Sequence, residues 1–264
     1  MEIISYHRPT SLDEAYDLMV KQGATPLAGG AWTLTSRKSL ASGVDLSELG
    51  LRFIKTEGEY VVIGAMTTAR DMETSELLAE IFGPLFARAL GGIAGVQIRT
   101  IVTAGGNVAG RYGFSELLVL LLALDASLVF YKNGTKSLAS YLDSPPGGAF
   151  LLEKILIPRD AKAAYQCLRQ AANDFPVLSV CAARSKAGWR IAVGARPKAA
   201  ALSLKAGSFL TGAENPDEVS SRKAGLLAAE ELSFGDDLRA SAEYRRSVCP
   251  VLVTRAIGGC AYDA

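Results

Sequence analysis

The spacing of apolar residues changes from a helical period to a strand period within the first 65 residues. Residues 11–22, "SLDEAYDLMVKQ", place Ala15, Leu18 and Met19 on one face, with Ser11 as N-cap and Glu14 three residues later. Gly23 is suited to end that helix. A short strand then leads into the glycine pair Gly29-Gly30, and "YVVIGA", residues 60–65, predicts a second strand.

The middle of the chain alternates predicted helices with extended segments. We expect a helix beginning near Thr68, a helix in "PLFARALGGIAG" and an apolar helix over 115–124 with Ser115 as N-cap. The β-branched "IRTIVTAGG", residues 98–106, is predicted to be extended. "ASLVFYKNGTKSL" predicts a hairpin whose Asn133-Gly134 suits a type I′ turn, and "AFLLEKILIP" predicts a strand.

The pattern becomes antiparallel beyond residue 160. "AYQCLRQA", "PVLSVCAARSKAGWRIAVGA" and "KAGSFL" predict three or more strands, with a turn at 186–188. Two helices are expected to follow, one starting at 215–218 and one over roughly 241–261, which contains Pro250. The change in pattern predicts a domain boundary near residue 160, between domains 1–160 and 161–264.

Composition excludes several classes of function. The 264 residues carry a net charge of +1 and are 49% hydrophobic, so neither nucleic acid nor a membrane is an expected partner. His7 is the only histidine, which excludes an HExxH metal site, and the four cysteines form no CxxC pair. No secretory signal opens the chain, and its longest apolar run, 117–124, cannot span a bilayer, so we expect a cytoplasmic protein.

The tripeptide Ala-Gly-Gly occurs twice, at 28–30 and at 104–106. Each copy follows a segment predicted to be extended, and a glycine turn after a strand offers consecutive N–H groups that can bind an anion. Two such turns side by side could hold a diphosphate. No GxGxxG motif opens a helix and no GxxxxGK[ST] motif occurs, so a dinucleotide would require a different fold.

Four segments in order, "SYHRPTSLDEAYDLMVKQGATPLAGG", "VVIGAMTTARDME", "IRTIVTAGGNVAG" and "LLALDASLVF", resemble the FAD-binding (medium) subunits of molybdenum hydroxylases. That family includes xanthine dehydrogenase and carbon monoxide dehydrogenase flavoproteins. The resemblance implies an α+β fold: a two-subdomain FAD-binding domain of the PCMH (vanillyl-alcohol-oxidase-like) type, then a C-terminal antiparallel sheet with helices. The subdomains would cover about 1–57 and 58–160.

The resemblance also implies a binding site for noncovalent FAD and no catalytic or metal-binding residue on this chain. The residues it assigns to FAD are Leu27, Ala28, Gly29, Gly30, Ala31, Trp32, Thr33, Ile93, Ala94, Thr103, Ala104, Gly105, Gly106, Asn107, Glu116, Leu152 and Arg169. Main-chain amides of both glycine segments would bind the diphosphate, with Arg169 near the isoalloxazine. Glu116 replaces the family's aspartate and either accepts FAD hydroxyls or caps a helix; Arg169 has a solvated surface position as its alternative.

In the implied function, electrons pass from [2Fe–2S] clusters through FAD to NAD⁺. The clusters and the molybdenum cofactor would belong to partner subunits. Two other functions stay open: a self-standing FAD oxidoreductase of related fold, and a nucleotide-binding scaffold subunit that has lost flavin.

Overall fold

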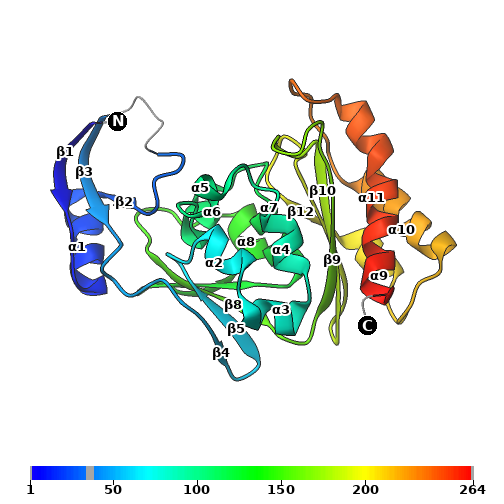
Figure 1. Ribbon diagram of the computed structural model, residues 1–264, viewed down its shortest axis with the longest axis horizontal. Helices are drawn as coiled ribbons and strands as arrows, with labels where there is room; N and C mark the ends of the chain where they lie inside the picture. Colours follow the sequence, from blue (N-terminus) through cyan, green and yellow to red (C-terminus); the bar gives the residue numbers. More distant parts are fainter. Residues whose placement is uncertain (1, 34–38, 263–264) are drawn as a thin grey trace.

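The strands of this computed structural model, which describes residues 2–33 and 39–262, form three separate sheets. Figure 1 shows the sheets and their helices as three blocks side by side along the longest axis. The small N-terminal block has a parallel sheet in the order β1-β3-β2, packed on one helix. Its elements are β1 (Glu2–His7), α1 (Leu12–Gln22), β2 (Thr25–Leu27) and β3 (Ser39–Asp45).

The middle block is built on an antiparallel five-stranded sheet in the order β4-β5-β8-β6-β7. The strands are β4 (Ile54–Glu57), β5 (Tyr60–Gly64), β6 (Ser127–Phe130), β7 (Gly134–Ser137) and β8 (Leu152–Pro158). The helices are α2 (Ala69–Glu73), α3 (Glu76–Phe82), α4 (Leu85–Leu90), α5 (Val96–Arg99), α6 (Ala104–Gly110), α7 (Glu116–Ala123) and α8 (Leu138–Asp143).

The C-terminal block is an antiparallel sheet in the order β12-β11-β10-β9, with helices on its outer face (Figure 1). Its elements are β9 (Lys162–Leu168), β10 (Leu178–Ser185), β11 (Gly188–Gly194), β12 (Ala201–Ser203), α9 (Leu204–Phe209), α10 (Glu218–Glu231) and α11 (Ala242–Tyr262). Alternate residues of β10 face opposite sides. Val180 and Ala182 join the core under the C-terminal helices, whereas Cys181 and Ala183 join the core of the middle block.

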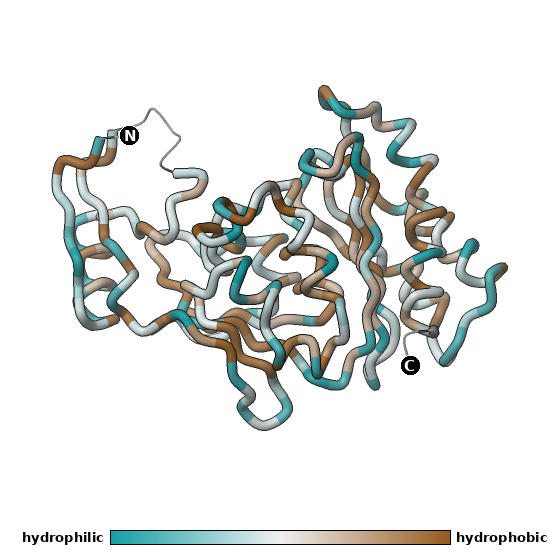
Figure 2. Tube along the Cα trace, in the orientation of Figure 1, coloured by the Kyte–Doolittle hydropathy of each residue, from teal (hydrophilic) through white to brown (hydrophobic). Residues whose placement is uncertain are grey.

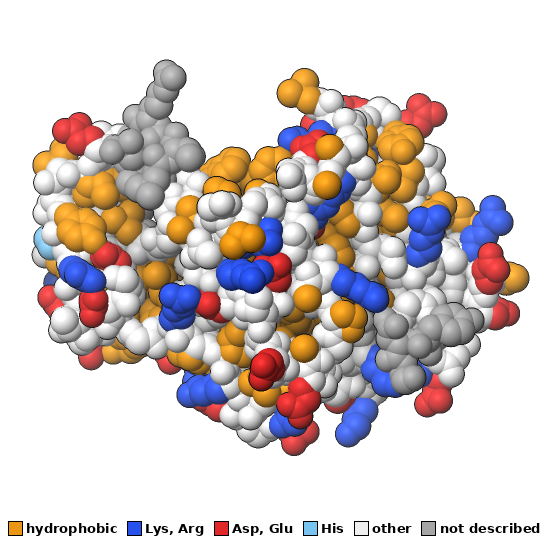
Figure 3. Space-filling view, in the orientation of Figure 1, with side chains coloured by type: hydrophobic (Ala, Val, Ile, Leu, Met, Phe, Trp, Pro, Cys, Tyr) orange, Lys and Arg blue, Asp and Glu red, His pale blue; other side chains and the backbone are white. Residues whose placement is uncertain are grey.

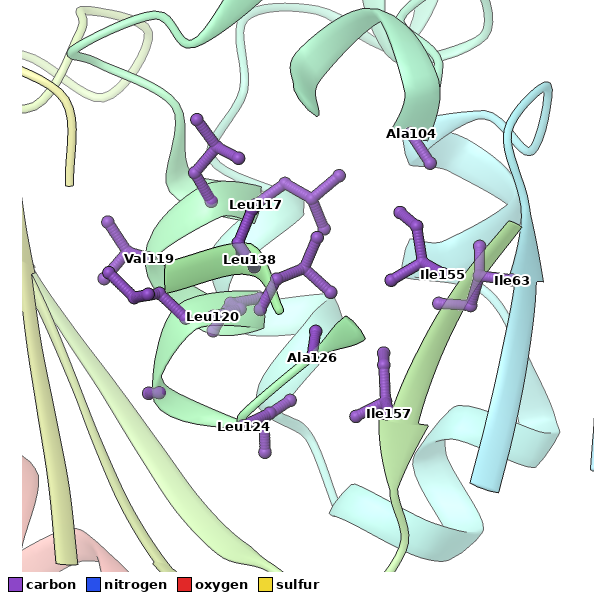
Figure 4. Packing of buried hydrophobic residues seen from close by; sticks show 14 of the residues in the cluster. Ile63, Ala104, Leu117, Val119, Leu120, Leu124, Ala126, Leu138, Ile155 and Ile157 are labelled. Atoms are coloured by element: carbon purple, nitrogen blue, oxygen red, sulfur yellow. The ribbon is translucent and has the colours of Figure 1, made fainter. Parts of the chain in front are cut away.

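Helix α7 lies between the middle and C-terminal blocks and packs against both. Each of its residues is at most 3% exposed, so no side of this helix faces solvent. Figure 4 shows Leu117 on the side of the helix toward Ile155 and Ile63 of the middle sheet, and Val119 on the side toward the C-terminal sheet. Figure 2 shows the apolar stretches concentrated inside the blocks, and Figure 3 shows acidic and basic side chains intermixed over one face.

Most predicted helix starts are confirmed. Ser11, Thr68 and Ser115 are the N-caps of α1, α2 and α7, and each accepts a hydrogen bond from a backbone N–H three residues later. Gly23 ends α1 in the left-handed conformation, φ 64°. The antiparallel strands after residue 160 and the α+β fold are confirmed as well.

Three local predictions are wrong. Residues 98–106 are not extended, because α5 and the start of α6 occupy most of that range. "KAGSFL" is not a strand: it lies in α9, whose N-cap is Ser203. The hairpin is present, but its turn covers the three residues 131–133. Positive φ occurs at Lys132 (59°) and at Gly134 (76°), the first residue of β7, and not at both residues of the Asn-Gly pair as a type I′ turn requires.

Candidate functional site: a glycine loop beside two buried arginine–glutamate pairs

The first glycine loop follows β2 and packs against the segment that leads to the second glycine motif. A Cβ built on Gly29 would lie 1.6 Å from the carbonyl oxygen of Ile101, so no other residue type fits there without moving the backbone. Gly30 has φ 73°, a conformation that favours glycine. The two Ala-Gly-Gly segments, more than 70 residues apart in sequence, therefore lie close together.

Four consecutive backbone amides of this loop have no hydrogen-bond acceptor in the part of the chain that the structure describes. Among the described residues, none accepts a hydrogen bond from the N–H groups of Ala28, Gly29, Gly30 or Ala31. Unpaired amides next to one another concentrate partial positive charge. This loop can therefore donate to an anionic group from outside the chain.

The second glycine motif is different, because it forms the first turn of α6. The Ala104 and Gly105 amides donate to the carbonyls of Thr67 and Ala65 at 2.8 and 2.7 Å. The Gly106 amide donates to Thr103 Oγ1 at 3.1 Å, and the Asn107 amide to the Thr103 carbonyl at 3.0 Å. These four amides are engaged within the protein. The expectation that both segments present free amides therefore holds only for the first loop.

The carboxylate of Glu116 lies in a buried ion pair with Arg169. Their side chains are 4% and 14% exposed, and the hydroxyl of Tyr165 donates to the same carboxylate at 2.9 Å. Burial raises the pKa of Glu116, and the Arg169 charge opposes that shift. The surface position considered for Arg169 is wrong, as is the helix-capping role of Glu116, because Ser115 is the N-cap. In this arrangement the carboxylate is buried and binds Arg169 and the Tyr165 hydroxyl.

Arg169 connects the C-terminal domain to the turn of residues 91–95, between α4 and α5. Its guanidinium donates to the carbonyl of Gly92, to that of Asp174 at 3.1 Å and to the sulfur of Cys167 at 3.3 Å. A Cβ on Gly92 would lie 2.4 Å from Arg169 Nη2, so the guanidinium lies directly on this turn.

The same turn contains the predicted contacts Ile93 and Ala94. Ala94 adopts a left-handed φ of 39°, which costs a non-glycine residue about 1–2 kcal/mol. Ile93 packs against the apolar cluster that includes Leu152, a residue 6% exposed at the start of β8. Two of the predicted apolar contacts, Ile93 and Leu152, thus belong to one cluster.

Four aromatic rings lie at the outer side of the glycine loop. Trp32, 52% exposed, contacts Tyr112 and Phe114 with ring centroids 5.4 Å away in both cases. Phe175 of the β9–β10 loop lies 4.3 Å from Phe114 and 6.4 Å from Trp32. These rings join three separate segments of the chain. Thr33, beside it, is exposed.

Sequence reasoning missed Arg99, which is 7% exposed and lies under the same turn. It donates to the carbonyls of Ile93 and Ala94 and is paired with Glu73. The available signal was a single arginine inside the apolar run "IRTIV", since a charged residue is rarely buried unless it is paired.

The ion pair of Glu73 makes the stability of the fold depend on pH. Burial raises its pKa, but hydrogen bonds from Arg99 and Arg70 outweigh burial and hold the pKa below the usual glutamate value. A lowered folded-state pKa stabilises the fold above the unfolded pKa, about 4.3, and this stability is lost as pH falls through the folded-state pKa.

We expect Glu73→Gln to be less stable than the wild type at pH 7 by about 1.5–3 kcal/mol, with a shallower loss of stability below pH 5. Urea unfolding at a series of pH values would measure both effects. Glu80→Gln, an exposed carboxylate on the next helix, serves as control. Parallel acid profiles for Glu73→Gln and the wild type would contradict the assigned ion pair.

Within the described ranges, no group of three or more histidine, cysteine, aspartate or glutamate side chains could hold a metal ion. None of the helices in those ranges has the length and apolarity needed to cross a membrane.

The structure is that of an α+β chain with a glycine loop whose amides have no acceptor among the described residues. Residues 2–160 match the FAD binding domain in molybdopterin dehydrogenase, and residues 163–259 match the CO dehydrogenase flavoprotein C-terminal domain. The chain belongs to this family of FAD-binding medium subunits.

Individual relatives align over almost the whole chain. It is 30% identical to the carbon monoxide dehydrogenase medium chain of Afipia carboxidovorans, over 96% of this chain and 94% of that one. It is 26% identical to the nicotine 6-hydroxylase medium subunit of Paenarthrobacter nicotinovorans, over 96% of both. Among solved structures, Cu,Mo-CO dehydrogenase matches with a TM-score of 0.88 and 28% identity, over 99% of both chains.

Proposed function

We propose that this protein is the FAD-binding electron-transfer subunit of a molybdenum-dependent hydroxylase. The observation that carries the proposal is the row of amides at Ala28–Ala31, which have no acceptor among the described residues and lie where Gly29 packs on Ile101. A diphosphate carries two negative charges and several acceptor oxygens, which is the chemistry these donors suit.

Other residues assigned to FAD have side chains that fit its remaining parts. Ile93 and Leu152 offer apolar contacts, and Trp32 offers an aromatic one. The guanidinium of Arg169 places positive charge close to the turn, where it would favour electron density on a neighbouring ring. When bound, FAD supplies the capacity to accept electrons singly and release them as a pair.

The protein itself needs no general acid or base for that role. Its residues bind and orient the cofactor and hold charge near it, while the organic substrate would be oxidised on another chain. The relatives are medium chains or medium subunits by name, which supports assembly with an iron–sulfur subunit and a large molybdenum-cofactor subunit. The four cysteines, all among the described residues, are not joined by disulfides, which supports a reducing compartment such as the cytoplasm.

Titration of the flavin-free protein with FAD tests the proposal. We expect binding of one equivalent, with much weaker binding of flavin mononucleotide, because the latter lacks the diphosphate bridge. Absence of FAD binding, measured by flavin fluorescence and visible absorbance, would leave only the scaffold alternative.

The finer assignment is a xanthine dehydrogenase-like enzyme that uses NAD⁺ as acceptor. Anaerobic addition of NADH distinguishes this assignment from the self-standing oxidoreductase. Bleaching of the bound flavin by NADH, without an organic substrate, favours NAD⁺ as the electron acceptor. Flavin that is bleached only by an organic substrate, with no other subunit present, favours the self-standing oxidoreductase.

A further inference from the structure

The turn between α4 and α5 is held from two sides by buried arginines. Arg99, at the end of α5, donates from Nη1 to the carbonyls of Ile93 and Ala94 at 3.0 Å each. Arg169, from the C-terminal domain, donates to the carbonyl of Gly92. Three successive carbonyls are thus fixed by side chains rather than by a helix or a sheet.

Each of the two arginines forms an ion pair with a different glutamate. Arg99 Nε lies 2.8 Å from Glu73 of α2, and these side chains are 9% and 13% exposed. Helices α2 and α5 lie in the same part of the middle block, as Figure 1 shows. Arg169 is paired with Glu116 at the start of α7.

A buried ion pair adds little net stability compared with apolar side chains of similar size. The Arg99 guanidinium, however, does more than balance Glu73, because its remaining donors fix the backbone of a turn in a strained conformation. Ala94 has a left-handed φ, and its carbonyl is one of the two that Arg99 binds. This geometry indicates a role in orienting the turn.

We propose that Arg99 is a positioning residue of the FAD site, which holds Ile93 and Ala94 in the orientation that contacts the cofactor. The proposal rests on the proposed function and adds to it a residue that does not itself touch FAD. Arg169 holds the neighbouring carbonyl from the other domain, so the turn is fixed only when both domains are in place.

Arg70 provides a matched control. It pairs with the same Glu73 carboxylate at 3.0 Å, but its side chain is 41% exposed and it approaches from the solvent side. Arg70→Met therefore removes one positive charge from Glu73, as Arg99→Met does, and leaves the hydrogen bonds to the turn in place.

The experiment measures FAD affinity, the rate of FAD release and thermal stability for wild type, Arg99→Met, Arg99→Lys and Arg70→Met. We expect Arg99→Met to weaken FAD binding about 10-fold through faster release, and Arg70→Met to change it less than about 2-fold. Arg99→Lys keeps the charge beside Glu73 but loses the planar fork, so it should bind FAD with intermediate affinity.

Equal FAD affinity in wild type, Arg99→Met and Arg99→Lys, with only the melting temperature lowered, would assign Arg99 a purely structural role and overturn the proposal. If Arg99→Met does not fold, the FAD affinity and melting temperature of Arg99→Lys are compared with those of the wild type instead, and unchanged FAD affinity again overturns the proposal. A wild-type protein that binds no FAD would instead contradict the proposed function, so the two failures are distinguishable.

Discussion

Gly29→Ala is expected to lower the affinity for FAD by about 100-fold or more, the largest effect of any single substitution considered. A Cβ at this position would lie 1.6 Å from the Ile101 carbonyl oxygen and 2.7 Å from its carbon, far inside van der Waals contact. Both atoms belong to the backbone, which cannot rotate away as a flexible side chain would. The loop would have to move off the segment on which it packs, and its four amides would move with it.

Isothermal titration of the flavin-free variant with FAD measures this effect, and circular dichroism confirms that the variant folds. Gly147→Ala is a suitable control, because a Cβ there has no atom within 4 Å. Wild-type affinity in a folded Gly29→Ala protein would mean that the first glycine loop does not hold the diphosphate.

Glu116→Leu is expected to reduce the free energy of unfolding by about 3–5 kcal/mol, because it leaves the Arg169 guanidinium buried without its counter-charge. The Tyr165 hydroxyl loses its acceptor in the same variant. Arg169→Met should have a similar cost, since it leaves the Glu116 carboxylate buried and unpaired.

A double-mutant cycle measures the coupling between the two residues. It compares the free energies of unfolding in denaturant of the wild type, the two single variants and the double variant. The double variant should be more stable than the sum of the two single losses indicates, because neither charge is then left alone. Glu48→Gln, which breaks an exposed pair with Arg8, should cost at most about 1 kcal/mol and serves as control. Additive losses at Glu116 and Arg169 would contradict the buried pair.

Local signals in the sequence were sufficient for much of the fold. Each helix start at Ser11, Thr68 and Ser115 depends on one side chain and a backbone amide three residues away, so the pattern is readable within a few residues. The pattern over residues 98–106 was misleading, because β-branched residues that favour strands are overridden here by tertiary packing.

The site was predictable in part. The glycines of the first loop were recognised because glycine pairs mark unusual backbone positions, and Gly29 occupies one. Sequence could not reveal that the Ala104 and Gly105 amides are used within the protein, since their acceptors, the carbonyls of Thr67 and Ala65, lie far earlier in the chain. Nor could it pair Glu116 with Arg169, 53 residues apart, because that contact exists only once the two domains meet.

The position of α7 constrains how genes for such subunits can be rearranged in evolution. The helix belongs by sequence to the first domain, yet Cys181 and Ala183 of the second domain complete the core around it. A chain cut near residue 160 would present a leucine-rich surface to water and would be prone to aggregate. A recombinant that takes one domain from a distant relative should therefore fold only when the residues that pack against this helix come from the same parent as the helix.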